Sequence, residues 1–290
     1  MREALVSPPL GFDVKESYNT RMDPKNRPDP KLAFAQWSNF VHALHYELGV
    51  KVHFLTPDPA LPDMVFACDP GLWIDDLFIP ANFQVRQRQR EVFHFLSWFK
   101  GKILGEVGFL PGEAHFEGGD AVFVEKYKTL ILGYGEQRTN ERGVLAVKAL
   151  LEPRGIKVVP IRRVTEEFYH LNSVLTVYPT ADLLVYFPTA FELDAGAILR
   201  EALPKMEVSV FGQDDLYRDH PAFGYKRIYS YCLNSIERHR KVITCYNSPR
   251  LAALLEDRHL DILETESSEL EKSGGSWRCS MLIHNETRRA

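Results

Sequence analysis

The amino-acid sequence predicts a mixed α/β fold, and three observations support this prediction. Short apolar runs of strand length recur along the 290 residues, segments with helical periodicity separate many of them, and polar turn motifs interrupt both. Strands that alternate with helices of about ten to eighteen residues are typical of α/β architecture. Because no low-complexity linker divides the sequence, we expect one domain over residues 1–290.

The expected strands are rich in Val, Ile, Phe and Tyr, and most are bounded by Pro, Gly, Asp or Asn. In chain order they are KVHFLTP, DMVFACD, LWIDDLFIP, AVFVEKYKTLILGYG, IKVVPI, SVLTVYP, DLLVYFP, MEVSVFG, RKVITCYN and CSMLIHN.

The expected helices lie between these runs. They are PKLAFAQWSNFVHALHYELG, RQREVFHFLSWFKGK, TNERGVLAVKALLEPRG and SPRLAALLEDRH. The last three end near Gly, Pro or a basic residue, as helix C-termini often do. Residues 211–226, FGQDDLYRDHPAFGYK, fit neither pattern, so we expect a surface loop or a short lid there.

The composition narrows the class of protein. With 45% apolar and 26% charged residues, the chain is typical of globular proteins rather than disordered or membrane-embedded ones. Its net charge of −4 and scattered Lys and Arg residues argue against a nucleic-acid partner, which needs a basic face. No stretch approaches eighteen consecutive apolar residues, and the N-terminus lacks the apolar segment of a signal peptide. We therefore expect a cytoplasmic protein without a membrane partner.

The four cysteines show neither a disulfide nor a zinc-binding pattern. Cys68, Cys232, Cys245 and Cys279 include no C-x-x-C pair, and no histidine follows at zinc-finger spacing. A chain of this length also buries enough core without cross-links. We therefore expect four reduced thiols and no metal site.

Five polar turn motifs punctuate the chain. They are CDPG near residue 69, FEGGD near 118, YHLNS near 171, YCLNS near 233 and GGSWRC near 277. Their spacing of roughly 45 to 65 residues suggests an internal repeat of about fifty residues, which is typical of propeller-like arrays. If each repeat places its motif at a common centre, the five motifs form one site.

The ionisable residues of these motifs suit nucleophilic catalysis. They are Asp69, Glu117, Asp120, His170 and Cys279. A thiolate attacks an electron-poor carbon while an imidazole moves protons. Nearby carboxylates raise the pKa of a thiol, so the combination suggests a cationic substrate that the carboxylates bind and that stabilises the thiolate. A guanidinium or amidinium fits, because carboxylates bind it in a bidentate manner.

Six segments resemble, in order, the signature of the guanidino-group modifying enzymes. They are SPPLGFDVKESYNTRMDP, LPDMVFACDPGL, HFEGGDAVF, GYGEQRTNERG, EEFYHLNSVLT and GGSWRCSML. This superfamily includes arginine deiminase, dimethylarginine dimethylaminohydrolase, arginine dihydrolase and the amidinotransferases. The resemblance implies a five-bladed α/β propeller, or pentein, in which ββαβ modules are arranged with pseudo-fivefold symmetry around a central active site. It implies no metal and no organic cofactor.

The resemblance also implies roles for individual residues. Cys279 corresponds to the family nucleophile, His170 to the general acid/base, and Glu117 to the carboxylate that binds the guanidinium. Arg138 takes the place of the arginine that pairs with the substrate's α-carboxylate, and Arg88 is a second candidate for that task. The remaining candidates for substrate binding are Asp69, Asp120, Asn172, Phe12, Asp13 and Asn19, although Asp120 also fits a turn-stabilising role.

Two departures bear on the substrate. Arginine deiminases and dihydrolases carry H-L-D, where this chain has Asn172, and dihydrolases carry Asn where it has Asp69. Dimethylarginine dimethylaminohydrolases also lack the second Asp, so HLNS resembles their pattern. An amide at residue 172 tolerates an N-alkylated guanidinium, whereas a carboxylate there would stay unpaired. The favoured activity is therefore hydrolysis of methylarginine to citrulline and methylamine.

Three alternatives remain open. Arginine deiminase or dihydrolase activity is one, and amidino transfer is another, although the chain lacks the longer insertions of the transferases. A different class is a non-catalytic propeller that binds a macromolecular partner. Cys279, His170 and Glu117 together favour an enzyme. The expected partner is a small guanidino compound, and the sequence leaves a homodimer open.

Overall fold

The computed structural model describes residues 2–103, 105–246 and 248–287. Within them, the strands form five units that share one topology. In each unit the first strand is antiparallel to the second, the second is parallel to the third, and a helix connects the second to the third. The mixed α/β prediction is therefore confirmed, with a ββαβ repeat.

The units follow the chain, except that the last strand joins the first unit. Unit 1 consists of β17 (Met281–Asn285), β1 (Glu3–Val6), α1 (Pro30–His42) and β2 (Lys51–Phe54). Unit 2 consists of β3 (Gly71–Ile74), β4 (Leu77–Pro80), α2 (Glu91–Lys102) and β5 (Glu106–Val107). Unit 3 consists of β6 (Ala121–Val124), β7 (Thr129–Tyr134), α3 (Glu141–Leu151) and β8 (Lys157–Arg162). Unit 4 consists of β9 (Leu175–Tyr178), β10 (Leu183–Tyr186), α4 (Ala195–Ala202) and β11 (Glu207–Val210). Unit 5 consists of β14 (Ile236–Arg238), β15 (Lys241–Thr244), α6 (Pro249–Glu256) and β16 (Asp261–Glu264).

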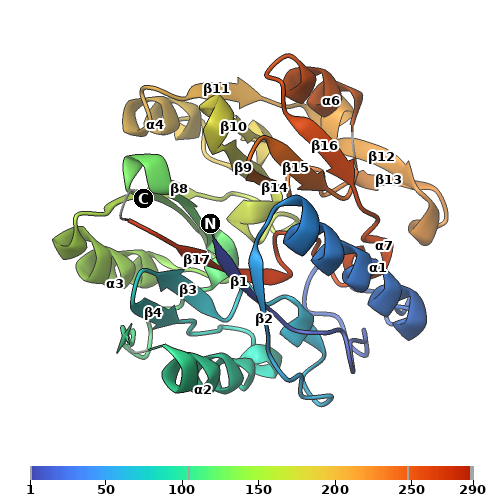
Figure 1. Ribbon diagram of the computed structural model, residues 1–290, viewed down its shortest axis with the longest axis horizontal. Coiled ribbons are helices and arrows are strands. Elements are labelled where there is room, and N and C mark those ends of the chain that lie inside the picture. The colour runs from blue at the N-terminus through green and yellow to red at the C-terminus, as the bar shows by residue number, and fades with distance from the viewer. Residues whose placement is uncertain (1, 104, 247, 288–290) are drawn as a thin grey trace.

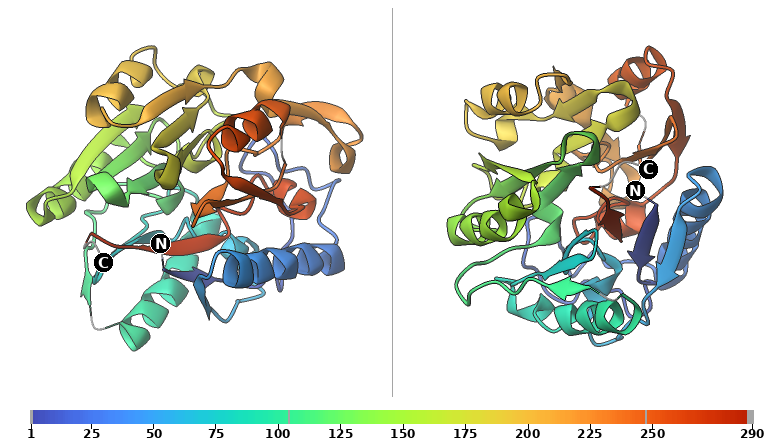
Figure 2. Two further views of the ribbon diagram at one scale, coloured as in Figure 1. Left: turned by 45° about the horizontal axis from the view of Figure 1, so that its top comes forward. Right: turned by 60° about the vertical axis from the view of Figure 1, so that its left-hand side comes forward.

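Unit 1 joins the two ends of the chain. Strand β17 runs antiparallel to β1, so that Leu5 faces Leu282, and it also pairs in parallel with β3 of unit 2. Figure 1 shows β1 and β17 side by side in the middle of the molecule, with α2, α3, α4 and α6 toward its periphery. The views in Figure 2 show the same helices on the outside.

Burial of the strands follows their apolar pattern. Strands β3, β4, β6 and β10 are buried at every position, in keeping with their uninterrupted apolar sequences. Strands β2, β11 and β16 are exposed at both ends and only half-buried between. The first two strands of a unit therefore form the interior, and the third strand lies nearer the solvent.

Helix starts are defined by capping residues that the sequence provides. The Asp29 side chain accepts hydrogen bonds from the backbone N–H groups of Lys31 and Leu32, with Pro30 at the first helical position of α1. Asn140 caps α3 through Gly143, and Ser248 caps α6 through Leu251. These caps provide partners for backbone donors that a helix start otherwise leaves unpaired.

The structure differs from the predicted elements in several places. Strands β1, β5, β14 and β16 were not predicted. The expected strand DMVFACD is a 3₁₀ turn at 62–65, and the backbone turns again as Phe66 N donates to Asp63 O at 2.9 Å. Helix α4, with its short and small-residue sequence AGAILREA, was not predicted. The run LWIDDLFIP is a hairpin that turns at Asp75, whose φ of 49° is left-handed.

Residues 211–226 form neither a loop nor a lid. They contain the short helix α5 (Gln213–Leu216) and most of a hairpin of β12 (Tyr217–His220) and β13 (Lys226–Tyr229). His220 connects the hairpin to helix α7 (Ser268–Glu271). Its Nε2 atom lies 3.0 Å from Oε2 of Glu271, and both side chains are buried. No helix among the described residues is long and apolar enough to cross a bilayer.

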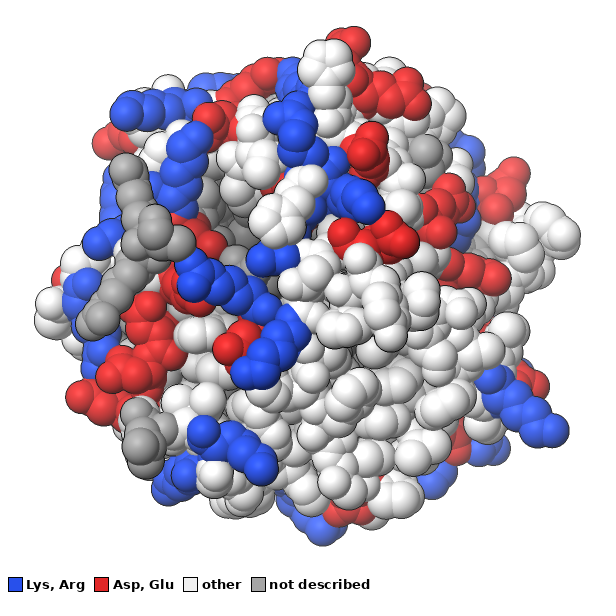
Figure 3. Space-filling view, viewed as in Figure 1, with Lys and Arg blue, Asp and Glu red and all other residues white. Residues whose placement is uncertain are grey.

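The surface carries mixed charge on the face that Figure 3 shows. Lys and Arg side chains alternate there with Asp and Glu, and a broad uncharged area lies below them.

Candidate active site

The five units place polar side chains at equivalent positions, in the turn before the first strand of each unit. These side chains are Asp69 before β3, Glu117 before β6, His170 before β9, Asn234 before β14 and Cys279 before β17. The first strands lie in the interior, so their preceding turns meet. The five turn motifs of the sequence therefore form one site.

A small cavity of about 20 Å³ lies where these turns meet. We call it the site cavity. Its walls are formed by Tyr18, Asn19, Asp63, Phe66, Asp69, Arg88, Arg138, Tyr169, His170, Ser273, Gly274, Gly275 and Cys279. Six residues predicted from the sequence are among them: Asn19, Asp69, Arg88, Arg138, His170 and Cys279.

His170 is held between two carboxylates. Its Nε2 lies 2.9 Å from Oε2 of Glu117, and its Nδ1 lies 3.5 Å from Oδ1 of Asp69. Burial lowers the pKa of His170, but the negative charges of Asp69 and Glu117 outweigh burial and raise the pKa above its ordinary value. The imidazole is thus favoured in its protonated form, which suits a general acid.

Glu117 has an unused hydrogen-bond acceptor. Among the described residues, no group bonds its buried Oε1 atom, whereas Oε2 contacts His170 and, at 3.5 Å, Nη1 of Arg138. Burial raises the pKa of Glu117, but the positive charges of Arg138 and His170 outweigh burial, so the net shift of the pKa is downward. A buried acceptor without a donor costs free energy, and a bound cationic donor would remove that cost.

Two glycines allow the turns to approach closely. A Cβ atom on Gly118 would lie 2.1 Å from the carbonyl oxygen of Cys68, and one on Gly119 would lie 2.6 Å from Oδ1 of Asp69. Any side chain there would separate Glu117 from the Asp69 turn. The two glycines of EGGD are therefore required by packing.

The Cys279 residue is bound by Asn234 at both its thiol and its backbone. Asn234 Nδ2 donates to Cys279 Sγ at 3.2 Å, and Asn234 Oδ1 accepts from the Cys279 backbone N–H at 3.2 Å. The neighbouring Cys68 thiol lowers the pKa of Cys279 against the effect of burial. From the sequence we expected only a cationic substrate to stabilise the thiolate, so the roles of Asn234 and Cys68 were missed.

Arg138 adopts a backbone conformation that is rare for a residue with a side chain. Its φ is 67°, and its N–H donates to Oε1 of Gln84 at 3.0 Å. Its guanidinium lies 4.7 Å from the centre of the Tyr169 ring. Such left-handed residues persist only where the surrounding structure enforces them, and they cluster at functional sites. The strain directs a cation onto the wall of the site cavity.

Arg88 is already paired with two carboxylates. It contacts Asp69 through Nη1 and Glu91 through Nη2, the latter at 2.8 Å, and all three side chains are buried. Burial raises the pKa of Glu91 to about 8, and the Arg88 cation opposes this shift. Burial likewise raises the pKa of Asp69, but His170 and Arg88 outweigh it and lower the pKa. Arg88 therefore has less capacity for a substrate carboxylate than the sequence suggested.

Five predicted residues are not on the wall of the site cavity: Glu117, which contacts the wall residue His170, and Asp120, Phe12, Asp13 and Asn172. Asp120 accepts from the Leu171 backbone N–H at 3.1 Å and from Arg163 at 3.2 Å, so it supports the His170 turn. These bonds fit the turn-stabilising role that the sequence left open for Asp120, and a direct contact with substrate stays a prediction.

The other three lie behind the cavity wall. Phe12 is buried and packs edge-on against Phe66, with ring centres 5.9 Å apart. Asp13 is paired with Arg27. Asn172 donates through Nδ2 to Cys68 Sγ at 3.3 Å and accepts through Oδ1 from Cys279 Sγ at 3.5 Å, so its amide contacts both thiols.

Two residues of the site were not predicted: Asp63, on the wall of the cavity, and Asn234, which binds Cys279. Asp63 accepts from Tyr18 and, at 3.1 Å, from Ser273, and burial raises its pKa to about 6. Asn234 had a detectable signal, because L-N-S occurs at both Asn172 and Asn234 in two of the five turn motifs. Asp63 carried no signal beyond its place within LPDM.

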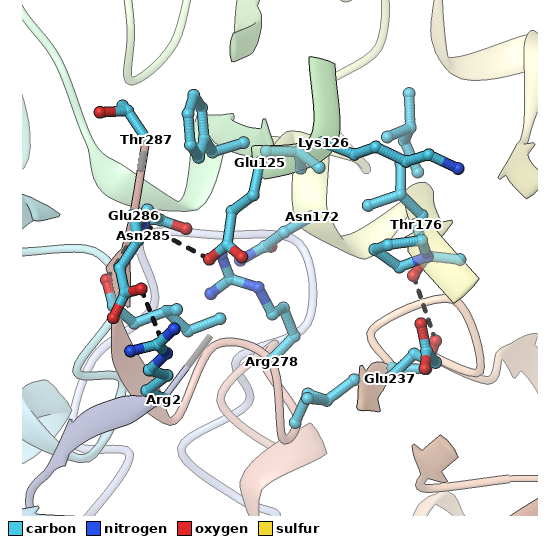
Figure 4. A pocket seen from close by; sticks show the side chains of 18 residues that line it. Arg2, Glu125, Lys126, Asn172, Thr176, Glu237, Arg278, Asn285, Glu286 and Thr287 are labelled. Carbon is cyan, nitrogen blue, oxygen red and sulfur yellow. Dashed lines mark hydrogen bonds and ion pairs between the residues drawn. The ribbon is translucent and has the colours of Figure 1, made fainter. Parts of the chain in front are cut away.

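A second and larger cavity, of about 420 Å³, adjoins Asn172. Figure 4 shows Arg278 and Glu125 near its middle and Glu237 on one wall. Arg278 directly precedes Cys279, so the backbone of this turn separates the two cavities.

Comparisons with known proteins identify related families. The arginine deiminase family model matches residues 43–210. A dimethylarginine dimethylaminohydrolase from Mycobacterium tuberculosis is 29% identical over 98% of this chain and 86% of that protein. A bifunctional arginine dihydrolase/ornithine cyclodeaminase from Nostoc is 27% identical over 96% of this chain, which covers 37% of that larger protein.

Solved structures match along the whole chain. The N-terminal domain of a cyanobacterial arginine dihydrolase, bound to its product, superposes with a TM-score of 0.86 at 25% identity and 98% coverage of both chains. A dimethylarginine dimethylaminohydrolase from Pseudomonas aeruginosa, in complex with citrulline, shares the fold with a TM-score of 0.76 at 20% identity, over 97% of this chain and 98% of that one. The chain therefore belongs to the arginine deiminase family, within the guanidino-group modifying superfamily that its motifs resemble.

Proposed function

We propose that this protein hydrolyses the guanidinium group of an arginine-like amino acid, with a methylated arginine as the favoured substrate. The observation that carries the proposal is the buried, unbonded Oε1 of Glu117, next to His170 and the cavity that Cys279 lines. A guanidinium provides planar N–H donors that match a carboxylate, and its central carbon accepts a nucleophile.

The reaction proceeds in two stages. Glu117 and Asp69 hold the guanidinium, and the Cys279 thiolate attacks its central carbon to form a tetrahedral adduct. His170 gives its proton to the departing amine, which leaves a covalent thiouronium. His170 then removes a proton from water, and the resulting hydroxide attacks the same carbon. The C–S bond breaks and releases a ureido product and the thiolate.

We also propose that the five ββαβ units form a pentein propeller and one catalytic domain over residues 1–290. The shared topology of the units, the pairing of β17 with both β1 and β3, and the meeting of the five turns support this arrangement. In it Arg138 binds the α-carboxylate of the substrate, since it is the cation of the cavity wall that is not already paired with two carboxylates.

The preference for methylarginine depends on the absence of a carboxylate at residue 172. Asn172 faces the two thiols and supplies no second carboxylate to the guanidinium, so an N-methyl group leaves no buried charge unpaired. The 29% identity to a dimethylarginine dimethylaminohydrolase over 98% of the chain supports the same substrate.

A second candidate is arginine dihydrolase activity. The TM-score of 0.86 to a cyanobacterial arginine dihydrolase favours it. The acid at Asp69 opposes it, because the dihydrolases that the motifs resemble carry Asn there. Dihydrolase action would release ammonia twice and yield ornithine, whereas the favoured reaction yields citrulline and a methylamine.

The deciding experiment is a product assay on arginine, methylarginine, dimethylarginine, agmatine and citrulline. Ammonia, methylamine and dimethylamine are quantified separately, and citrulline and ornithine are separated by chromatography. Methylamines with citrulline support the proposal, and ammonia with ornithine supports the dihydrolase. The Cys279→Ser variant serves as the control and should show no turnover. If no substrate releases amine, the binding-module alternative replaces both enzymatic readings.

A further inference from the structure

We propose that Cys68 is a resolving cysteine for Cys279: oxidation of the Cys279 thiolate by a peroxide leads to a reversible disulfide between Cys68 and Cys279. The proposal goes beyond the hydrolytic function and concerns the chemistry of the thiol pair itself. It rests on a backbone hydrogen bond between the two cysteines, on side-chain contacts and on which thiol reaches the cavity.

A backbone hydrogen bond joins the two cysteines. Cys68 and Cys279 lie in the turns that precede β3 and β17, and the Cys68 N–H donates to the Cys279 carbonyl at 3.0 Å. Backbones joined by such a bond lie about 4.8 Å apart, within the roughly 4.4–6.8 Å that a disulfide spans between Cα atoms.

The two sulfur atoms point into one shared environment. The Asn172 amide contacts both, at 3.3 Å from Cys68 and 3.5 Å from Cys279. Cys68 also donates to Oδ1 of Asp69 at 2.9 Å. Both thiols are buried, and the Cys68 thiol lowers the pKa of Cys279.

The two thiols differ in access. Cys279 lines the site cavity, whereas Cys68 lies behind it, so a small oxidant that enters the cavity meets Cys279 first. The thiolate is also the reactive form toward peroxides. Cys68 is therefore protected from direct oxidation and available for the second step.

The chemistry balances with hydrogen peroxide as the oxidant. The Cys279 thiolate attacks one peroxide oxygen and the O–O bond breaks. Hydroxide is the leaving group, and Cys279 becomes a sulfenic acid. The Cys68 sulfur then attacks the Cys279 sulfur, the S–O bond breaks, and the leaving hydroxide takes the proton of Cys68 as water. In total, two thiols lose two electrons, and two waters form once the first hydroxide is protonated.

The chain contains its own control pair. Cys232 and Cys245 are also buried and free, but neither lines the site cavity. Burial raises the pKa of Cys232 to about 11 and that of Cys245 well above its ordinary value. These two thiols should stay reduced under conditions that oxidise Cys279.

The test exposes the full-length protein to dilute hydrogen peroxide, alkylates remaining thiols under denaturing conditions, and maps peptides by mass spectrometry. We expect one linked pair of peptides containing Cys68 and Cys279, with Cys232 and Cys245 fully alkylated. Dithiothreitol should remove the link. This readout needs no substrate, so it stands even if the proposed hydrolysis fails.

The Cys68→Ser variant tests the role of the second thiol, with Cys245→Ser as the matched control. In Cys68→Ser we expect Cys279 to advance to sulfinic acid, which dithiothreitol does not reverse. Cys245→Ser should behave as the wild type. Sulfinic acid on wild-type Cys279 without a linked peptide, or a Cys232–Cys245 link in its place, overturns the proposal. If Cys68→Ser does not fold, the wild-type peptide map still decides.

Discussion

The Nε2 atom of His170 lies 2.9 Å from the Oε2 atom of Glu117, and both side chains are buried. This contact joins the turns before β9 and β6, which lie 53 residues apart in the chain. It orients the imidazole, stabilises its protonated form and leaves the other oxygen of Glu117 without a partner. One carboxylate can thus position the acid and receive a guanidinium.

The Glu117→Gln variant should lose most activity. The amide keeps the size of the side chain but removes the negative charge that His170 and a guanidinium share. We expect kcat/KM to fall roughly 100- to 1000-fold, as on loss of a pre-organised electrostatic partner. Steady-state kinetics on the best substrate of the panel measures the effect. Glu136→Gln, on an exposed side chain, is the control, and wild-type kinetics in Glu117→Gln would contradict the assigned role.

The Asn234→Ala variant should raise the pKa of Cys279. Asn234 donates to the sulfur at 3.2 Å, and a hydrogen bond to a thiolate favours the charged form. The rate of inactivation by iodoacetamide, followed against pH, reports the thiolate fraction. We expect the midpoint of this profile to move to higher pH. The control is Asn26→Ala, which removes a hydrogen bond to the Ala222 carbonyl away from the site and should leave the profile unchanged. An unchanged midpoint in Asn234→Ala would show that the hydrogen bond from Asn234 to Cys279 does not affect the pKa of the thiol.

The Arg88→Met variant should destabilise the fold. Removal of the guanidinium leaves Asp69 and Glu91 buried without the Arg88 cation. Breaking a buried ion pair in this way lowers the free energy of unfolding by about 3–5 kcal/mol. Urea unfolding measures the loss. The exposed Arg86→Met should change the free energy of unfolding by less than about 0.5 kcal/mol. A stable Arg88→Met protein with a raised KM would instead assign Arg88 to the substrate.

The pH dependence of stability should show the titration of His170. Its pKa is raised in the folded protein, so the folded state binds its proton more tightly than the unfolded state. This contribution is fully present below the unfolded pKa of about 6.5 and is lost as pH rises through the folded value. Unfolding free energies of the wild type and His170→Asn, compared from pH 6 upward, should converge. His42→Gln, at an exposed histidine, is the control variant. Parallel wild-type and His170→Asn curves would contradict the raised pKa of His170.

The local elements were largely predictable from the sequence. Nearly all apolar runs became strands, because β-branched and aromatic residues between turn formers leave few other ways to bury their surface. DMVFACD failed because its Asp63 side chain is taken by Tyr18 and Ser273, which are distant in the chain. Helix α4 was missed because eight residues with one glycine give a weak periodic signal.

For the site, the sequence alone determined the chemical inventory: a cysteine, a histidine and carboxylates in turns spaced about fifty residues apart. It also identified six of the residues on the cavity wall. Only the tertiary structure decided their partners, because hydrogen bonds between units depend on atomic positions that local patterns do not encode. In the tertiary structure Asp120 accepts a hydrogen bond from the turn that carries His170, and the Asn172 amide contacts the two thiols. Arg88 forms an ion pair with Glu91. The tertiary structure also placed Cys68 beside Cys279, since the turns before β3 and β17 are joined by the hydrogen bond from the Cys68 N–H to the Cys279 carbonyl.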